Sequence, residues 1–249
     1  MLLVGVTDHM RNIAILAFLT TTCLADAMTV TQVVDQASGV SALVYTLPSA
    51  ENCGFSLLDV PSKKDGDTIK EHWDPTNHLV MVNGGYFNSD FSPTGLCRVE
   101  GRTLSGGASP KLSGFVGIDK AGKVHILTQQ DDVMDYPTLL QAGPFVIDPG
   151  GLIGIRSRSG AQARRTLVGL TKVGDLVIIV TEPVYLLDFS RFVAKRFPSI
   201  DRLINLDGGP STALMSGNYT VLNQWPVRNY LVKKRETPTT PPTVPDSAR

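Results

Sequence analysis

The segment Asp207-Gly208-Gly209-Pro210-Ser211-Thr212 has the residue types best suited to chemistry. Asp207 follows the predicted strand over residues 200–206, so its carboxylate is expected at the end of a buried strand, where a charge is costly unless it is paired or used. The glycines expose backbone N–H groups, and Ser211 and Thr212 add hydroxyls, which together suit a phosphate or a sugar ring. Pro210 removes one donor from this set. The alternative is a turn that the Asp207 side chain caps.

Three further clusters of polar and small residues lie at the ends of apolar runs. Asn83-Gly84-Gly85 follows the run 78–82, and glycines at a strand end let the backbone approach a ligand closely. Arg164-Arg165-Thr166 opens a strand, and arginine binds phosphate through a bidentate fork. Gln141-Ala142-Gly143 precedes the run 145–147. Each cluster alone is compatible with a simple turn or a surface ion pair, but jointly they predict one cleft.

The remaining pattern predicts the elements that position these clusters. Alternating apolar residues between 30 and 58 predict strands, and residues 115–127 and 166–180 each predict a hairpin. Residues 200–206 predict a further strand, and residues 212–222 a strand pair. The clearest helix spans residues 188–197, with Asp188 as N-cap and Pro198 after its end. We therefore expect an α+β (mixed α/β) fold, a single domain in which a mixed, mostly antiparallel twisted β-sheet packs on a few helices.

The N-terminus has the pattern of a secretory signal peptide. Arg11 precedes the apolar run 13–19, which is too short to span a bilayer, and Ala25-Asp26-Ala27 fits a cleavage site. Met10 is the better start, and the alternatives are a lipoprotein lipidated at Cys23 or a plain buried helix. We predict a signal peptide over residues 1–27, a domain over residues 28–235, a disordered Thr/Pro-rich tail over residues 236–249, and a periplasmic or secreted protein.

Removal of the signal peptide would leave two cysteines, Cys53 and Cys97, which form either one disulfide or two buried thiols.

The 23 basic and 23 acidic residues give zero net charge, which argues against binding nucleic acid by bulk charge. The 42% of apolar residues and 18% of charged residues are typical of a folded protein. We expect neither a nucleic-acid partner nor stable membrane insertion after signal cleavage. The chain also lacks a G-x-S-x-G, an H-E-x-x-H and a G-x-G-x-x-G motif.

Five segments, taken in this order, resemble the phosphodiester glycosidase family over roughly residues 80–232. They are NGGYF (83–87), PTGLCRVEGR (93–102), QAGPFVID (141–148), RRTLVGLTKVGDLVIIV (164–180) and INLDGGPSTALMSG (204–217). The stretch 185–207 is also similar to a bacterial branch of exported proteins in the same superfamily. The resemblance implies an exported hydrolase that cleaves the sugar–phosphate bond of a sugar 1-phosphodiester, with a role in envelope or exopolysaccharide metabolism. Family members often carry a third glycine where this chain has Pro210.

Such a reaction requires a site that holds the phosphate charge and stabilises a cationic sugar carbon. We assign the phosphate to Arg165, with the anomeric carbon facing Asp207 as nucleophile or base. Glu182 is the second carboxylate candidate, and its alternative is an exposed loop residue. The predicted substrate-binding residues are Asn83, Gly84, Gly85, Gln141, Gly143, Thr166, Gly208, Gly209, Ser211 and Thr212; among them the N–H groups of Gly84, Gly85, Gly208 and Gly209 would support the phosphate, and Asn83, Gln141 and Thr212 would bind sugar hydroxyls.

We expect no cofactor, although carboxylate and amide oxygens leave a structural or catalytic divalent cation open. Two other functions fit the same residues. One is a non-catalytic module of the cell envelope that binds carbohydrate or sugar phosphate, because glycine N–H groups and an arginine serve binding equally well. The other is a plain structural domain in which Asp207 and Arg165 form an internal ion pair.

Overall fold

The structure is a computed structural model that describes residues 16–22, 28–105 and 107–235. Within these residues it is mostly β, with 43% strand, 10% helical residues, one α-helix and three antiparallel sheets. The expected α+β fold with a sheet packed on a few helices is therefore wrong. The physical reason is that most apolar runs are short and bounded by Gly or Pro turns, and one segment alone carries a helical stripe.

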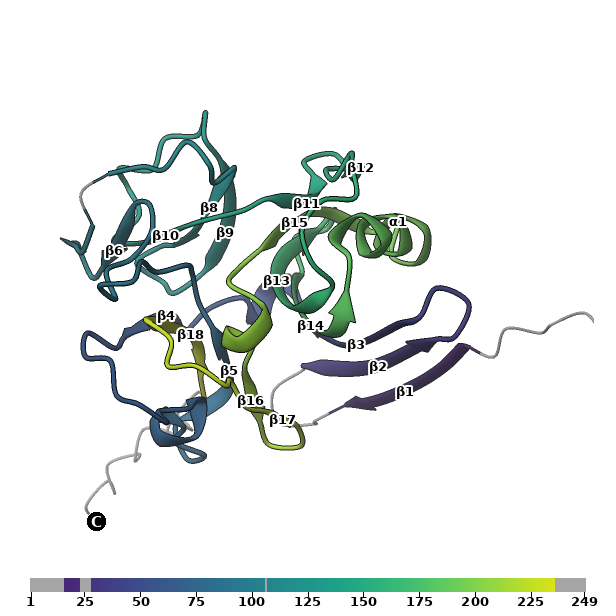
Figure 1. Cartoon of the computed structure of the whole chain (residues 1–249), viewed down its shortest axis with the longest axis horizontal. Helices are drawn as coiled ribbons and strands as arrows, with labels where there is room; N and C mark the ends of the chain where they lie inside the picture. The colour runs from purple at the N-terminus through teal and green to yellow at the C-terminus, as the bar shows by residue number, and fades with distance from the viewer. Residues whose placement is uncertain (1–15, 23–27, 106, 236–249) are drawn as a thin grey trace, which may run out of the picture.

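The largest sheet has eight strands in the order β1-β2-β3-β14-β13-β15-β11-β12 and occupies the right of Figure 1. Its strands are β1 (Leu16–Thr22), β2 (Thr29–Asp35), β3 (Val40–Leu47), β11 (Phe145–Asp148), β12 (Leu152–Ile153), β13 (Ala163–Thr171), β14 (Leu176–Val184) and β15 (Ile200–Asn205). β13 and β14 form the hairpin predicted over residues 166–180, and β15 is the strand predicted just before Asp207.

Two five-stranded sheets lie to the left of it in Figure 1, with the orders β7-β6-β10-β8-β9 and β17-β16-β5-β18-β4. The first contains β6 (Cys97–Val99), β7 (Arg102–Thr103), β8 (Gly114–Ile118), β9 (Val124–Thr128) and β10 (Thr138–Ala142). The second contains β4 (Phe55–Asp59), β5 (His78–Asn83), β16 (Leu214–Ser216), β17 (Thr220–Val221) and β18 (Asn229–Lys234). The predicted hairpin over residues 115–127 and the predicted strand pair over residues 212–222 are thereby confirmed.

The large sheet is buried on both faces, which explains the unbroken apolar run of β14. Val177 and Ile179 belong to the core cluster that contains Phe189 and Phe192 of the helix α1 (Leu186–Arg196). Ile178, between them in sequence, belongs to the cluster that joins the three sheets. Side chains alternate between the faces of a strand, so one run supplies both cores. Burial of each such side chain contributes about 1.5–3 kcal/mol.

The helix begins earlier than expected. Its N-cap is Tyr185, and Asp188, the predicted cap, lies in the first turn and forms an ion pair with Arg158. The other helical segments are short 3-10 turns: η1 (Ser49–Glu51), η2 (Ile69–His72) and η3 (Gly209–Ser211).

The predicted signal peptide falls largely outside the described residues, which include its positions 16–22 as strand β1, paired antiparallel with β2. The predicted tail over residues 236–249 lies wholly outside them, so both remain predictions. In the described part of the chain no helix is long and apolar enough to cross a membrane. Cys53 and Cys97 form no disulfide with each other. Cys97 is buried, and this burial raises the pKa of its thiol to about 12.

Candidate active site

The four predicted clusters meet where strands of all three sheets end. Asp207, after β15, donates its N–H to the carbonyl of Gly84 after β5 at 3.1 Å. Gly143, after β10, donates its N–H to the Asn205 carbonyl at 3.0 Å. Leu206 donates its N–H to the Thr166 carbonyl of β13 at 2.9 Å. Segments far apart in sequence therefore lie together, and each reaches the junction at the end of a buried strand.

Gly84 and Gly85 are required here by close packing. A Cβ on Gly84 would lie 1.9 Å from Asn229 Oδ1, and a Cβ on Gly85 would lie 2.7 Å from Leu140 Cδ1. Their N–H groups donate to the carbonyl and to Oδ1 of Asn229, at 2.8 and 2.9 Å. The two N–H groups predicted to hold phosphate are thus used within the protein.

The two remaining glycine donors differ from each other. The Gly208 N–H donates to Asp207 Oδ1 at 2.8 Å. Among the hydrogen bonds of the described residues none uses the N–H of Gly209, whose φ is +60°. Pro210 brings no N–H, so Gly209 is the donor of this turn that is left for an anion.

Asn83 acts as a brace of the junction. Its side chain is fully buried, and its Oδ1 accepts hydrogen bonds from Thr166 Oγ1 at 2.6 Å and from the Ala213 N–H at 3.0 Å. Its Nδ2 donates to the carbonyl of Asp207 at 2.8 Å. The side chain that was predicted to bind a sugar hydroxyl therefore positions the Asp207 backbone in this structure. The Thr166 hydroxyl, also predicted to bind substrate, is hydrogen-bonded to the same side chain.

Gln141 likewise has all its polar groups occupied. Its Oε1 accepts from the N–H groups of Leu96 and Ser109 at 3.0 and 2.7 Å, and its Nε2 donates to the Ser109 carbonyl at 2.8 Å. The side chain is fully buried. It ties the backbone of Leu96 and Ser109 to β10 and has no exposed surface with which to bind a sugar.

Asp207 is the partly buried carboxylate of the site. Burial raises its pKa, although hydrogen bonds from Ser211 and from the Gly208 N–H act in the opposite direction. A carboxylate with a raised pKa is a stronger base than an ordinary aspartate when it is ionised. Ser211 thus hydrogen-bonds the Asp207 carboxylate. The sequence predicted Ser211 as a substrate-binding residue and did not indicate this contact.

Arg165 lies directly beside this carboxylate turn. A Cβ on Gly208 would lie 3.7 Å from Arg165 Cδ. The guanidinium is half-buried, which lowers its pKa, and its Nη2 donates to the Ala161 carbonyl at 2.6 Å. Among the ion pairs of the described residues, none joins Arg165 to Asp207. The internal ion pair expected of a plain structural domain is therefore not formed.

Tyr86 and Asn205 belong to the site and were missed by the sequence reasoning. The Tyr86 hydroxyl donates to the Gly143 carbonyl at 2.8 Å and accepts from Asn205 Nδ2 at 2.6 Å. Burial raises the pKa of Tyr86, and the nearby charge of Asp207 raises it further. The signal in the sequence was position alone: Tyr86 follows the two glycines, and Asn205 precedes Asp207 by two residues.

Four buried side-chain atoms of the described residues have no hydrogen-bond partner: Arg165 Nε, Asn205 Oδ1, Thr212 Oγ1 and Asn229 Nδ2. All four belong to residues at this junction or next to it in sequence. Buried polar groups are nearly always paired, because an unpaired group costs about 1–3 kcal/mol. The missing hydrogen bonds around this partly buried carboxylate can be supplied by ordered water or by a polar ligand.

Glu182 lies elsewhere. It is exposed on β14 and lines a cavity of about 140 Å³ together with Arg164 and Tyr219. Arg164 donates to the Leu222 carbonyl, whereas Arg165 lies beside Gly208, so these sequence neighbours on β13 have different surroundings. No contact of the described residues joins Glu182 to Asp207, and the second carboxylate expected from the sequence is not brought to the first.

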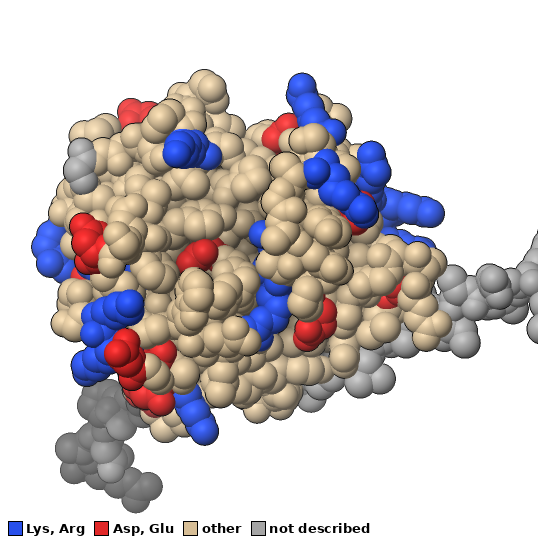
Figure 2. Space-filling model, viewed as in Figure 1, with Lys and Arg blue, Asp and Glu red and all other residues tan. Residues whose placement is uncertain are grey.

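No group of three or more His, Cys, Asp or Glu side chains in the described residues is placed to hold a metal ion. On the face shown in Figure 2, acidic and basic side chains are interspersed, apart from a gathering of Lys and Arg over α1 and β12. An anionic group at the junction would therefore be held by local donors such as Arg165 and the Gly209 N–H.

Three solved structures share the fold of this chain. The zebrafish N-acetylglucosamine-1-phosphodiester alpha-N-acetylglucosaminidase catalytic domain, auto-inhibited by its pro-peptide, is 17% identical with a TM-score of 0.59, over 89% of this chain and 88% of that one. A hypothetical protein from Synechocystis is 13% identical with a TM-score of 0.60, over 84% and 62% of the two chains. A candidate exported protein from Burkholderia pseudomallei K96243 is 12% identical with a TM-score of 0.57, over 78% and 74%.

These likenesses show a shared fold. No curated protein matches the chain. The family model described as phosphodiester glycosidase matches residues 76–234, which include every segment that meets at the junction. The chain therefore belongs to the phosphodiester glycosidase family.

Proposed function

We propose that the protein hydrolyses the bond between the anomeric carbon of a sugar and the phosphate of a sugar 1-phosphodiester. The observation that carries the proposal is the pair formed by Asp207 and Arg165. Both are partly buried, they lie beside the same glycine, and neither neutralises the other through an ion pair. A carboxylate for the sugar carbon and a guanidinium for the phosphate are the two groups that this reaction needs.

In the proposed reaction, water replaces the phosphate at the anomeric carbon, and the C–O bond to the phosphate breaks with its electron pair leaving on the phosphate oxygen. Asp207 accepts the proton from water, or attacks the carbon first and is released by water in a second step. Arg165 and the Gly209 N–H stabilise the charge on the departing phosphate. This leaving group is a weak base, so the site requires no strong acid, in keeping with the absence of a contact between Glu182 and Asp207 in the described residues.

We further propose that the enzyme is exported and acts on envelope or exopolysaccharide components. The support is the signal-like sequence of residues 1–27 together with the structural likeness to a candidate exported protein. Export would be tested by fractionating expressing bacterial cells and by sequencing the N-terminus of the mature protein. Recovery in the cytoplasm with an intact N-terminus would contradict it.

The catalytic proposal is tested by incubating the purified protein with a panel of sugar 1-phosphodiesters and measuring free sugar by mass spectrometry. Asp207→Asn should fold and lose about 10²–10⁴-fold in turnover, because it lacks the base. Asp65→Asn, at an exposed loop position, is the matched control and should keep full activity. Turnover by Asp207→Asn near the wild-type rate would remove Asp207 from the mechanism.

The role of Arg165 has its own matched control on the same strand. Arg165→Gln should lose about 10²–10³-fold in kcat/KM, because it removes a charge that stabilises the leaving phosphate. Arg164→Gln changes the neighbouring side chain on β13, which lines the cavity beside Glu182, and should lose little. Equal losses in the two variants would show that the strand, rather than the Arg165 guanidinium, accounts for the effect.

A further inference from the structure

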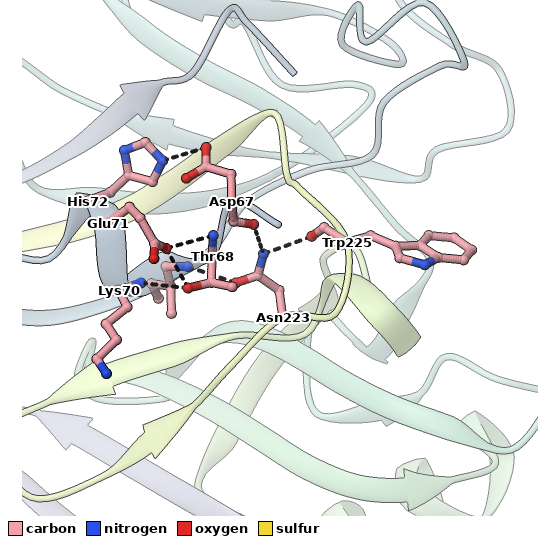
Figure 3. Close-up of polar contacts among 8 residues, drawn as sticks. Asp67, Thr68, Lys70, Glu71, His72, Asn223 and Trp225 are labelled. Carbon is pink, nitrogen blue, oxygen red and sulfur yellow. Dashed lines mark hydrogen bonds and ion pairs between the residues drawn. The ribbon is translucent and has the colours of Figure 1, made fainter. Parts of the chain in front are cut away.

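The loop between β17 and β18 is held rigidly by one buried asparagine. Asn223 is 3% exposed, and its Oδ1 accepts the Ile69 N–H at 2.8 Å. Its Nδ2 donates to the carbonyls of Asp67 and Trp225 at 3.2 and 2.7 Å (Figure 3). The η2 turn that receives the loop is closed by reciprocal hydrogen bonds between Thr68 and Glu71. The loop backbone is therefore tied to a structured partner.

The same loop is tied on its other side to the candidate active site. The N–H groups of Gln224 and Trp225 both donate to the carbonyl of Pro210, at 2.7 and 3.3 Å. Pro210 belongs to η3, which directly follows Asp207 and Gly208. The backbone of Trp225 thus lies against the turn that carries the proposed base and the Gly209 donor.

The Trp225 side chain is nevertheless 61% exposed. In Figure 3 its ring points away from the polar cluster formed by Asp67, Thr68 and Asn223. A single exposed apolar side chain is ordinary on a protein surface. Here, however, the backbone that carries this large aromatic side chain is fixed by two hydrogen bonds to the Pro210 carbonyl and one from the Asn223 side chain, beside a turn that has an unused N–H donor. Rigid aromatic faces next to a few placed polar groups are typical of ligand sites.

We propose that Trp225 is a specificity-determining residue, whose indole stacks on the apolar face of a sugar ring in the bound phosphodiester. This inference rests on the proposed function, because the sugar ring is positioned by its phosphate, which Arg165 and the Gly209 N–H bind. Pyranose rings carry C–H groups on one face and hydroxyls at the edge. The indole covers the C–H face, while the polar atoms of the junction are left for phosphate and hydroxyls.

The first test compares kcat and KM of Trp225→Ala and Trp225→Phe for whichever member of the sugar 1-phosphodiester panel the wild type cleaves. Trp225→Ala should raise KM about tenfold and change kcat less than about threefold, since the stacking is similar in the ground and transition states. Trp225→Phe should restore most of the affinity, because it keeps an aromatic face. Met134→Ala, at a 74% exposed position on another loop, is the control and should behave as wild type.

The second test measures binding without turnover. Quenching of tryptophan fluorescence is titrated with N-acetylglucosamine 1-phosphate and with inorganic phosphate, in wild type and in Trp225→Phe, which retains Trp73. If the sugar phosphate quenches the wild-type fluorescence and Trp225→Phe loses this quenching, the inference is supported, even if no phosphodiester is cleaved and the proposed function fails. A cleaved substrate whose KM is unchanged in Trp225→Ala overturns the inference and leaves the proposed function intact. An equal response to both probes also overturns it, because phosphate has no apolar face.

Discussion

A methyl group added at Gly84 should test the three-sheet junction directly. The new Cβ would lie 1.9 Å from Asn229 Oδ1 and 3.1 Å from the Asn229 carbonyl oxygen, inside the sum of their radii. Asn229 is fully buried and cannot swing into solvent. Gly84→Ala should therefore break the hydrogen bonds from Gly84 and Gly85 to Asn229, at about 1 kcal/mol each, and overpack the junction by a further 1–3 kcal/mol or so.

The expected loss is about 3–5 kcal/mol in the free energy of unfolding, measured by urea titration with circular dichroism. A domain of this size should then melt roughly 6–20 °C lower. Gly217→Ala is the matched control, because a Cβ there meets nothing within 4 Å and the glycine is exposed in the β16–β17 turn. If the free energy of unfolding of Gly84→Ala lies within about 1 kcal/mol of the wild-type value while that of Gly217→Ala is unchanged, the close packing of Gly84 against Asn229 is wrong.

Three other outcomes follow from the site. Because burial raises the pKa of Asp207, folding favours its protonated form. Asp207→Asn should be more stable than wild type at neutral pH and lose that advantage below about pH 4, as thermal melts across pH would show. Asn83→Ala should lose about 3 kcal/mol or more, since three buried groups lose their partner, whereas the exposed Asn218→Ala should lose less than about 0.5 kcal/mol in the same urea titration. The Cys97 thiol should resist iodoacetamide until the protein unfolds, because it is buried with a raised pKa; peptide mass spectrometry that finds it labelled in native protein would contradict this placement.

Local patterns in the sequence were sufficient for several strands. The hairpin of β8 and β9 was predictable because two apolar runs flank a polar, glycine-containing turn. The strand before Asp207 was predictable for a similar reason. The helix was recognised from the spacing of Phe189, Phe192 and Val193, but its start was misplaced, because Asp188 is a common N-cap type that here forms an ion pair with Arg158.

The fold class was misjudged, because a short apolar run does not show whether a helix or another sheet packs against it. Residues 176–180 of β14 are apolar at consecutive positions, a pattern that suits any element covered on both sides. Whether helices or further sheets supply that cover depends on contacts between distant segments. In this chain two additional sheets cover one face of β14, and one helix covers the other.

The sequence by itself determined which residue types stand at the ends of buried strands, since Asp207, Arg165 and the paired glycines are readable from the order of apolar and polar residues. The tertiary structure alone decided how each polar atom is used. It committed Asn83, Gln141 and the N–H groups of Gly84 and Gly85 to internal hydrogen bonds, left Glu182 exposed beside Arg164, and brought Tyr86 and Asn205 to the site. The physical reason is that a hydrogen bond depends on distances of about 3 Å between groups far apart in the chain, and no local pattern of residues contains those distances.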